Sequence, residues 1–270
     1  VVTDSTADVP PALAEELGIT IIPANVHFGA VSFLDGLTLT KDEFYRRLVE
    51  GPVMPITSAP APGAFTEVYQ RLHQEAKQAG QPLEGIVSIH LASQLSGLFN
   101  VARLGAEDAP EVDVRLVDSR QVSFATGWLA VLAARAARQG QSLEQVTSLV
   151  EERVPRLRLV AMLDTLDYVR RSGRMGKAQW LIGTLLDIKV LLEVRDGQIR
   201  PLPDRVRTRR RGMERLVEVA AEMGPFEEMA VMHAHAPQSG QELLAQAAGL
   251  HPPERTLFAE IGVIIGAYTG

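Results

Sequence analysis

Two short segments concentrate hydroxyl-bearing and small residues where a strand is expected to give way to a helix. Residues 57–63 are Thr-Ser-Ala-Pro-Ala-Pro-Gly, and residues 93–97 are Ser-Gln-Leu-Ser-Gly. Hydroxyls and backbone N–H groups at a helix start can bind an anion such as a carboxylate or a phosphate, and Gly97 would let a ligand approach the backbone closely. The same residues also suit plain helix capping. On the sequence alone, both the anion-binding and the capping interpretations stay open.

Motifs for catalysis and for metal binding are few. The chain has no G-x-x-x-x-G-K-[ST] phosphate loop, no G-x-S-x-G elbow and no H-E-x-x-H pair. It has no cysteine and therefore no disulfide or thiolate metal site. His233 and His235 should share one face of an expected strand, but a metal site needs further ligands. A hydroxyl nucleophile needs a neighbouring base, and His90, six residues before Ser96 and inside an expected strand, suits that role poorly. We predict no catalytic residue, no metal and no cofactor.

Arginines cluster twice in the second half of the chain. Arg170, Arg171 and Arg174 lie close to Lys177, and residues 205–211 contain five arginines. Such clusters suit either a solvated cationic surface or a docking patch for an acidic partner or a phosphorylated ligand. The whole chain carries a net charge of −6, which argues against non-specific binding of nucleic acid.

The elements that would position these residues alternate in the first half. Helical patterns, two of them opened by capping boxes at Thr40 and Ser142, separate short apolar runs. One helix is expected from Pro10-Pro11 to Gly18 and another from the Thr40 capping box to near Gly51. Residues 93–105 are expected to form a turn leading into a helix, and further helices are expected over residues 64–79, 121–138 and 142–152. The strands are expected at Val1–Thr3, Ile19–Phe28, Ile86–Leu91 and Val112–Val117. This rhythm predicts an α/β domain, with a parallel sheet and helices on both of its faces.

The second half has a different pattern. Asp196-Gly197 separates two apolar runs and predicts a β-hairpin. Further strands are expected at Leu157–Leu163, Met229–His235 and near Leu257–Ile265, and helices over residues 165–171, 177–187, 210–223 and 241–249. This mixture predicts an α+β domain with a mixed or antiparallel sheet. We place the boundary near Pro155, which gives domains of residues 1–154 and 155–270.

Three features bear on the compartment. No stretch reaches the roughly 18 uninterrupted apolar residues of a membrane span. The N-terminal residues show no basic region followed by an apolar run, so no signal peptide is expected. The absence of cysteine is compatible with a reducing environment. Together they predict a cytoplasmic protein.

Motifs spread over the whole chain carry a family resemblance. They are Val2–Asp8, Phe33–Gly36, Thr57-Ser58 with Pro60 and Pro62-Gly63, Ser88–His90, Leu95–Gly97, Val117–Ser119, Leu163–Ala178, Val206–Arg209 and Ile265–Gly270. In this order they resemble the DegV family of bacterial fatty-acid-binding proteins, and the Leu163–Ala178 block is quite specific.

The resemblance implies a site for a long-chain fatty acid. The first domain would bind the carboxylate, and the second would help enclose the acyl chain in an apolar tunnel. Carried over by position, Thr57 and Ser96 would hydrogen-bond the carboxylate beside the backbone of Gly97, and Ser58 and Tyr268 would complete this site. The Phe124–Ala134 and Trp180–Leu186 segments are candidates to line the tunnel, or are plain core.

The resemblance also implies partners. A separate fatty-acid kinase would phosphorylate the bound acid, the chain would hold the acyl phosphate, and Arg170, Arg171 and Arg174 would face the kinase. Transient contact with a membrane surface would serve loading.

Three departures from the family pattern concern the carboxylate site. Leu98 stands where Thr often follows the Ser-Gly pair, and Ala59 and Ala61 stand where Gln and Ser are usual. Tyr268 replaces the histidine of Gly-Ala-His-Thr-Gly. Tyrosine can donate a hydrogen bond but is not cationic near neutral pH. We therefore expect hydrogen bonds to the carboxylate headgroup that are weaker or differently arranged.

Two other functions stay open. A small hydrolase or phosphotransferase would use Ser96 or Asp4, and the isolated protein would turn over its substrate. A regulator would sense a small anionic ligand and associate with a protein or DNA partner in response.

Overall fold

The computed structural model describes residues 1–81, 83–172, 189–204 and 206–270. Its first half contains the expected parallel sheet, in the order β2-β1-β6-β7. These strands are β1 (Val2–Asp4), β2 (Thr20–Ile22), β6 (Ile86–His90) and β7 (Val114–Asp118). Every residue of β6 is buried, as expected of a parallel strand covered on both faces.

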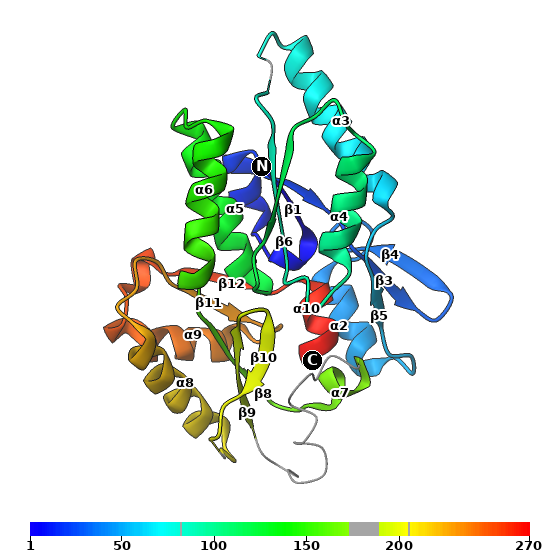
Figure 1. Cartoon of the computed structure of the whole chain (residues 1–270). Coiled ribbons are helices and arrows are strands. Elements are labelled where there is room, and N and C mark those ends of the chain that lie inside the picture. Colours follow the sequence, from blue (N-terminus) through cyan, green and yellow to red (C-terminus); the bar gives the residue numbers. More distant parts are fainter. Residues whose placement is uncertain (82, 173–188, 205) are drawn as a thin grey trace.

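Helices cover both faces of this sheet, as the sequence predicts (Figure 1). On one face Val87, Ile89 and Val117 pack with α1 (Pro11–Leu17), α5 (Ser123–Arg138) and α6 (Leu143–Arg153). On the other face Val2 and Ile86 pack with α3 (Pro62–Gln78) and α4 (Leu98–Glu107). The helix α5 is buried over most of its length.

The predicted single strand Ile19–Phe28 is wrong. Pro23 separates β2 from β3 (Asn25–Phe28), and β3 joins β4 (Val31–Leu34) and β5 (Ile56–Ser58) in a second, antiparallel sheet. Proline has no N–H for the sheet ladder, so the chain leaves the parallel sheet there. The small sheet packs against α2 (Lys41–Glu50) and carries Thr57 and Ser58 on its β5 strand.

The second half contains the expected hairpin. β9 (Val190–Arg195) pairs antiparallel with β10 (Gln198–Pro201) and with β8 (Leu159–Leu163). Asp196 and Gly197 adopt φ values of 52° and 73°, which is the requirement of a type I′ turn. The helices here are α7 (Asp167–Ser172), α8 (Arg209–Met223) and α9 (Pro237–Gln246). The predicted helix over residues 177–187 lies outside the described residues.

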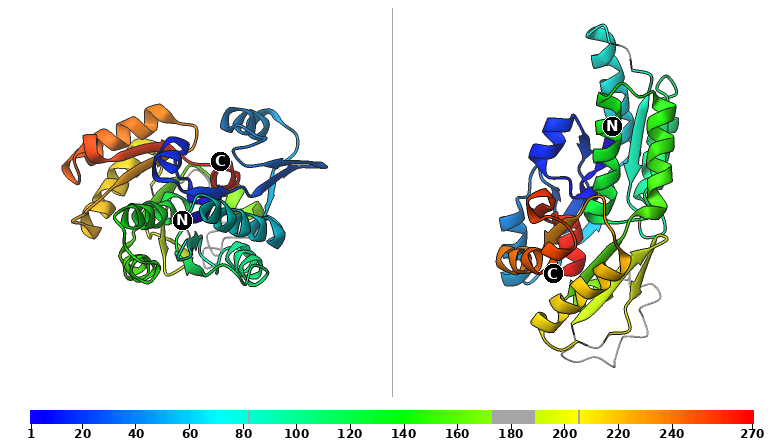
Figure 2. Two further views of the ribbon diagram at one scale, coloured as in Figure 1. Left: turned by 90° about the horizontal axis from the view of Figure 1, so that it is seen from above. Right: turned by 90° about the vertical axis from the view of Figure 1, so that its left-hand side faces the viewer.

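The chain returns to its first half at the end. β11 (Ala230–His233) pairs parallel with β12 (Leu257–Glu260), and the helix α10 (Val263–Thr269) follows. The prediction of a strand reaching Ile265 is therefore wrong, because the apolar run after Gly262 is helical. Residues of α10 pack with Ala24, Val26 and Phe44. Figure 2 shows α10 in red at the junction between the parallel sheet and the elements of the second half.

Within the described residues, no helix has both the length and the apolar character to cross a membrane.

One prediction concerns the packing of α5 against the turn after β1. A Cβ on Gly127 would lie 2.4 Å from the Ala7 carbonyl oxygen and 2.8 Å from the Phe124 ring. We expect Gly127→Ala to destabilise the fold by ~2 kcal/mol and to lower the Tm by roughly 5 °C. Gly63→Ala is the control, because a Cβ there meets nothing within 4 Å. Equal melting temperatures for both variants would contradict this close packing.

Candidate functional site

A large cavity lies between α5 and the elements of the second half. Its volume is about 1040 Å³, at the upper end of the range of ordinary ligand sites. Most of its wall is apolar: α5 contributes Phe124, Ala125, Trp128, Leu129 and Leu132, β8 contributes Leu159–Leu163, and α8 contributes Met213, Leu216, Val217, Ala220 and Met223. The expected lining role of Phe124–Ala134 therefore agrees with the structure, while Trp180–Leu186 lies outside the described residues.

Hydroxyl groups from distant segments also line this cavity. Thr57, Ser58, Ser96 and Tyr268 are all part of its wall, so the structure brings together four of the five predicted ligand-binding residues. The Thr57 and Tyr268 hydroxyls share a hydrogen bond, although 211 positions separate them in the sequence. Gly97 is exposed and begins α4, but it is not part of the cavity wall.

The contacts of these hydroxyls show how the local structure holds them. Ser96 Oγ accepts a hydrogen bond from the Leu98 N–H at 3.2 Å, so it caps the first turn of α4. Ser58 Oγ is hydrogen-bonded to His27 Nε2 at 2.9 Å. This contact agrees with the capping interpretation, and ligand binding by Ser96 stays a prediction, because a hydroxyl that accepts from the backbone can still donate its own proton to an anion.

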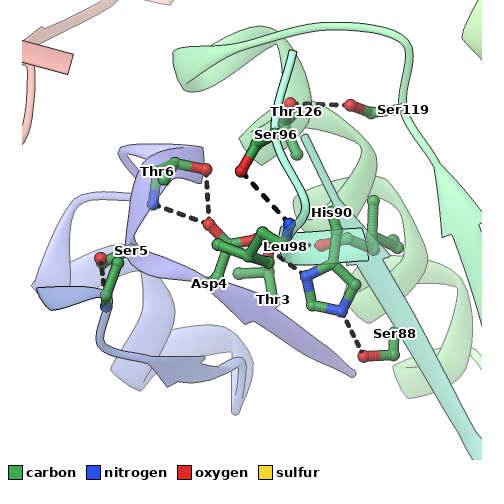
Figure 3. A network of polar contacts seen from close by, with 12 residues as sticks. Thr3, Asp4, Ser5, Thr6, Ser88, His90, Ser96, Leu98, Ser119 and Thr126 are labelled. Atoms are coloured by element: carbon green, nitrogen blue, oxygen red, sulfur yellow. Dashed lines mark hydrogen bonds and ion pairs between the residues drawn. The ribbon is translucent and has the colours of Figure 1, made fainter. Parts of the chain in front are cut away.

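A buried polar network lies behind this site (Figure 3). His90 Nδ1 lies 2.8 Å from Asp4 Oδ2, and His90 Nε2 lies 2.8 Å from Ser88 Oγ, which also contacts the Tyr69 hydroxyl. Asp4 accepts in addition from the Thr6 N–H at 2.9 Å. Asp4, Ser88 and His90 are fully buried and are not part of the cavity wall. The contact between Asp4 and His90 therefore links β1 to β6 away from the cavity wall.

The arginine clusters have different surroundings. Arg170 and Arg171 are exposed on α7, where Arg170 pairs with Asp167 at 3.1 Å. The same helix contacts α10, and its Tyr168 lines the cavity. Arg174 and Arg205 lie outside the described residues.

Most of the second arginine cluster engages neighbouring acidic side chains. Arg209 pairs with Asp164, and Arg211 pairs with Glu214 and Glu218. These charges are therefore locally compensated, and the Arg209–Asp164 pair is also part of the cavity wall.

The expectation that His233 and His235 share a strand face is wrong, because β11 ends at His233. The His233 ring packs against Phe258 with centroids 5.1 Å apart. His235 stacks on Tyr45 at 4.7 Å and bonds Glu260 at 3.0 Å. Across the described residues, no three His, Asp or Glu side chains gather in a way that could hold a metal ion.

Sequence reasoning missed Thr6, Ser123 and Asp8. Thr6 and Ser123 line the cavity. The buried Asp8 carboxylate accepts from the Ser123 hydroxyl and, at 2.7 Å, from the Gly262 N–H. It therefore joins the start of α5 to the residue that begins α10. The motif Val2–Asp8 contained this residue, but only the folded chain shows what it contacts.

Burial raises the pKa of Asp8 to about 7, although its hydrogen bonds from Ser123 and Gly262 oppose the shift. A carboxyl group whose pKa is higher in the folded state than in the unfolded state binds more protons when folded. We therefore expect the contribution of Asp8 to the free energy of unfolding to decrease as the pH rises from about 4 to about 7, by an amount on the order of 4 kcal/mol. Burial also raises the pKa of Asp35 to about 6, which acts in the same direction.

Asp8→Asn should flatten this dependence, because the amide is neutral; its oxygen can accept from the Gly262 N–H, and its NH2 group can donate to the Ser123 oxygen. Urea unfolding at several pH values between 4 and 7 measures the effect. The same pH dependence in wild type and in Asp8→Asn would contradict the expected ionisation of Asp8.

Comparisons with known proteins agree with the resemblance. The family described as "Uncharacterised protein, DegV family" matches residues 1–270. A DegV domain-containing protein of Streptomyces coelicolor is 36% identical over 274 residues, which cover 100% of this chain and 94% of that protein. A DegV family protein from Thermus thermophilus, solved for its fatty acid binding, has a TM-score of 0.86 and 30% identity, with 100% and 94% of the two chains covered. A stearic-acid-binding protein from Eubacterium ventriosum has a TM-score of 0.86 and 25% identity, with the same coverage.

The family match covers every residue, and the parallel and antiparallel sheets match those of solved members. The chain therefore belongs to the DegV family.

Proposed function

We propose that this protein binds one long-chain fatty acid, with the acyl chain in the cavity and the carboxylate at Thr57, Ser96 and Tyr268. The observation that supports this most is a large, mostly apolar cavity whose wall includes hydroxyls from β5, from the turn before α4 and from α10. Similar proteins from Thermus thermophilus and Eubacterium ventriosum bind fatty acids, stearic acid in the second case.

Simple energetics support this choice of ligand. An acyl chain of roughly 15 methylenes gains ~12 kcal/mol on leaving water, at ~0.8 kcal/mol for each methylene. Association and ordering offset a large part of this gain. A carboxylate without partners would cost several kcal/mol, so hydrogen-bond donors are needed at one end of an otherwise apolar site. Hydroxyls supply such donors without adding a charge.

The residues favour a carrier over an enzyme. Ser96 contacts a backbone N–H, and the ring of His90 is occupied by Asp4 and Ser88, so neither supplies the nucleophile–base pair that acyl transfer needs. We propose that a separate kinase phosphorylates the bound acid and that the protein then holds the acyl phosphate. Arg170 and Arg171, exposed on α7 beside α10, are proposed to face that kinase, together with Arg174 of the same motif. Transient contact with a membrane surface is proposed for loading.

Mass spectrometry of ligand extracted from the purified protein tests the binding. We expect a long-chain fatty acid in the extract, and saturable binding of added stearic acid to the delipidated protein. Absence of both would contradict the proposal. Turnover of an acyl ester or a phosphate ester by the isolated protein, lost in Ser96→Ala, would favour the hydrolase or phosphotransferase instead.

The kinase contact has its own test. We expect Arg170→Ala combined with Arg171→Ala to leave the affinity for stearic acid within about twofold, because neither side chain lines the cavity. Phosphorylation of the bound acid by the kinase should decrease at least tenfold, since cationic side chains at an interface increase association with an anionic partner. Unchanged phosphorylation would remove these arginines from the docking surface.

A further inference from the structure

The cavity has a second polar region, which consists of ion-paired residues. Arg153, Arg156 and Glu227 are part of its wall. The two arginines lie at the end of α6 and in the short helical turn Val154–Arg156, and Glu227 lies between α8 and β11. Figure 1 shows the end of α6 and the start of β11 on one side of the molecule and α10 and β5, which carry Tyr268 and Thr57, well apart from them.

Contacts along α5 agree with this arrangement. Arg135, near the end of that helix, pairs with Glu228 at 3.0 Å. Ser123, its first residue, instead donates to Asp8, which also contacts Gly262 before α10. The ion-paired region therefore lies about 18 Å along α5 from Ser123, at 1.5 Å per residue.

One carboxylate bridges the two walls at this end. Arg153 donates to Glu227 Oε2 at 2.9 Å, and Arg156 donates to Glu227 Oε1 at 2.6 Å. Each oxygen thus holds one guanidinium group. The neighbouring positions of the cavity wall include the apolar Leu157, Phe226 and Met229 and the charged Arg158 and Glu228.

The bridge lies at the protein surface. The side chains of Arg153, Arg156 and Glu227 are 33%, 55% and 67% exposed. Exposed ion pairs contribute little to stability and are screened by salt, so this end of the cavity opens more easily than a packed apolar wall.

We propose that Arg153, Arg156 and Glu227 form a gate at the far end of the cavity, which sets the acyl-chain length beyond which affinity stops rising. This inference rests on the proposed function. Up to the gate, each buried methylene increases affinity about fourfold. A longer chain must break both ion pairs to pass, and this cost offsets the gain from about the next two methylenes. Without the Glu227 carboxylate the two arginines repel each other and leave the apolar channel open.

The experiment measures the affinity of wild type and Glu227→Ala for saturated fatty acids of increasing length, in steps of two carbons. We expect the affinity of wild type to reach a plateau, and that of Glu227→Ala to rise for at least one further step. The first acid beyond the wild-type plateau should bind the variant about tenfold more tightly. Raising the salt concentration should also move the wild-type plateau toward longer acids and should leave the plateau of the variant unchanged.

Glu75→Ala is the matched control, because it removes an exposed Arg71–Glu75 pair of 3.0 Å on α3, outside the cavity wall. This variant should keep the wild-type plateau. Equal plateaus for wild type and Glu227→Ala, with fatty acid still bound, would overturn the gate alone. Binding of no fatty acid by either protein would overturn the proposed function as well.

Discussion

Thr57→Val combined with Ser96→Ala should lower the affinity for stearic acid at least a hundredfold. Both hydroxyls line the cavity, and a hydrogen bond to a charged group contributes about 1.5–3 kcal/mol. Losing two of them removes ~3 kcal/mol or more, and every 1.4 kcal/mol is a factor of ten in affinity. Valine keeps the shape of threonine, so the acyl part of the site should be unchanged. Isothermal titration of the delipidated variant measures the loss.

The methyl ester of the same acid separates headgroup binding from cavity damage. It has no negative charge to stabilise, so we expect the double variant to bind it within about threefold of wild type. Thr147→Val serves as a control for hydroxyl removal, because this residue bonds only the Leu143 carbonyl, at 2.7 Å, and lies outside the cavity wall. Equal losses for acid and ester would contradict a carboxylate site at Thr57 and Ser96.

Ala161→Phe should lower the affinity for stearic acid about fiftyfold. Ala161 lies on β8 and lines the cavity. A phenyl ring there occupies the space of about three methylenes, which are worth ~2.4 kcal/mol at ~0.8 kcal/mol each, and this is about fiftyfold in affinity. An acid short enough to end before β8 should bind as it does to wild type. Competition with a fluorescent fatty acid measures both affinities.

Ala161→Val provides a graded control, since the smaller side chain should give an intermediate loss. Thermal unfolding of each variant shows whether the fold persists. If Ala161→Phe binds stearic acid like wild type, the acyl chain does not pass β8, and the cavity is not its binding site as proposed.

Local signals in the sequence predict most of the elements correctly. The parallel sheet follows from apolar runs alternating with helical patterns, and the β9–β10 turn follows from Asp196-Gly197, whose positive φ values few other residues adopt. Two of the errors in the predicted strands have local causes. Pro23 divides an apolar stretch between two sheets, and the apolar run after Gly262 suits a buried strand as well as a buried helix. Periodicity alone cannot decide such short runs.

The site was only partly predictable for a different reason. Thr57 and Ser96 stand beside expected helix starts, where hydroxyls have a local purpose that sequence can indicate. Contacts between segments far apart in the sequence position Thr6, Ser123 and Asp8. One example is the hydrogen bond from the Gly262 N–H to Asp8, across 254 positions. No local pattern encodes such a contact, because tertiary packing decides which face of a turn meets the cavity.

The helix α10 has a consequence for how the protein is made. It packs with Ala24, Val26 and Phe44 and brings Tyr268 to Thr57, yet it is translated more than two hundred codons later than those partners. In a nascent chain on the ribosome, the apolar side chains of the β3–β4–β5 sheet and α2 that α10 covers therefore stay exposed until Val263–Thr269 have emerged. Lipid capture must wait for that late event, and the early-made sheet is where a chaperone would have most to shield.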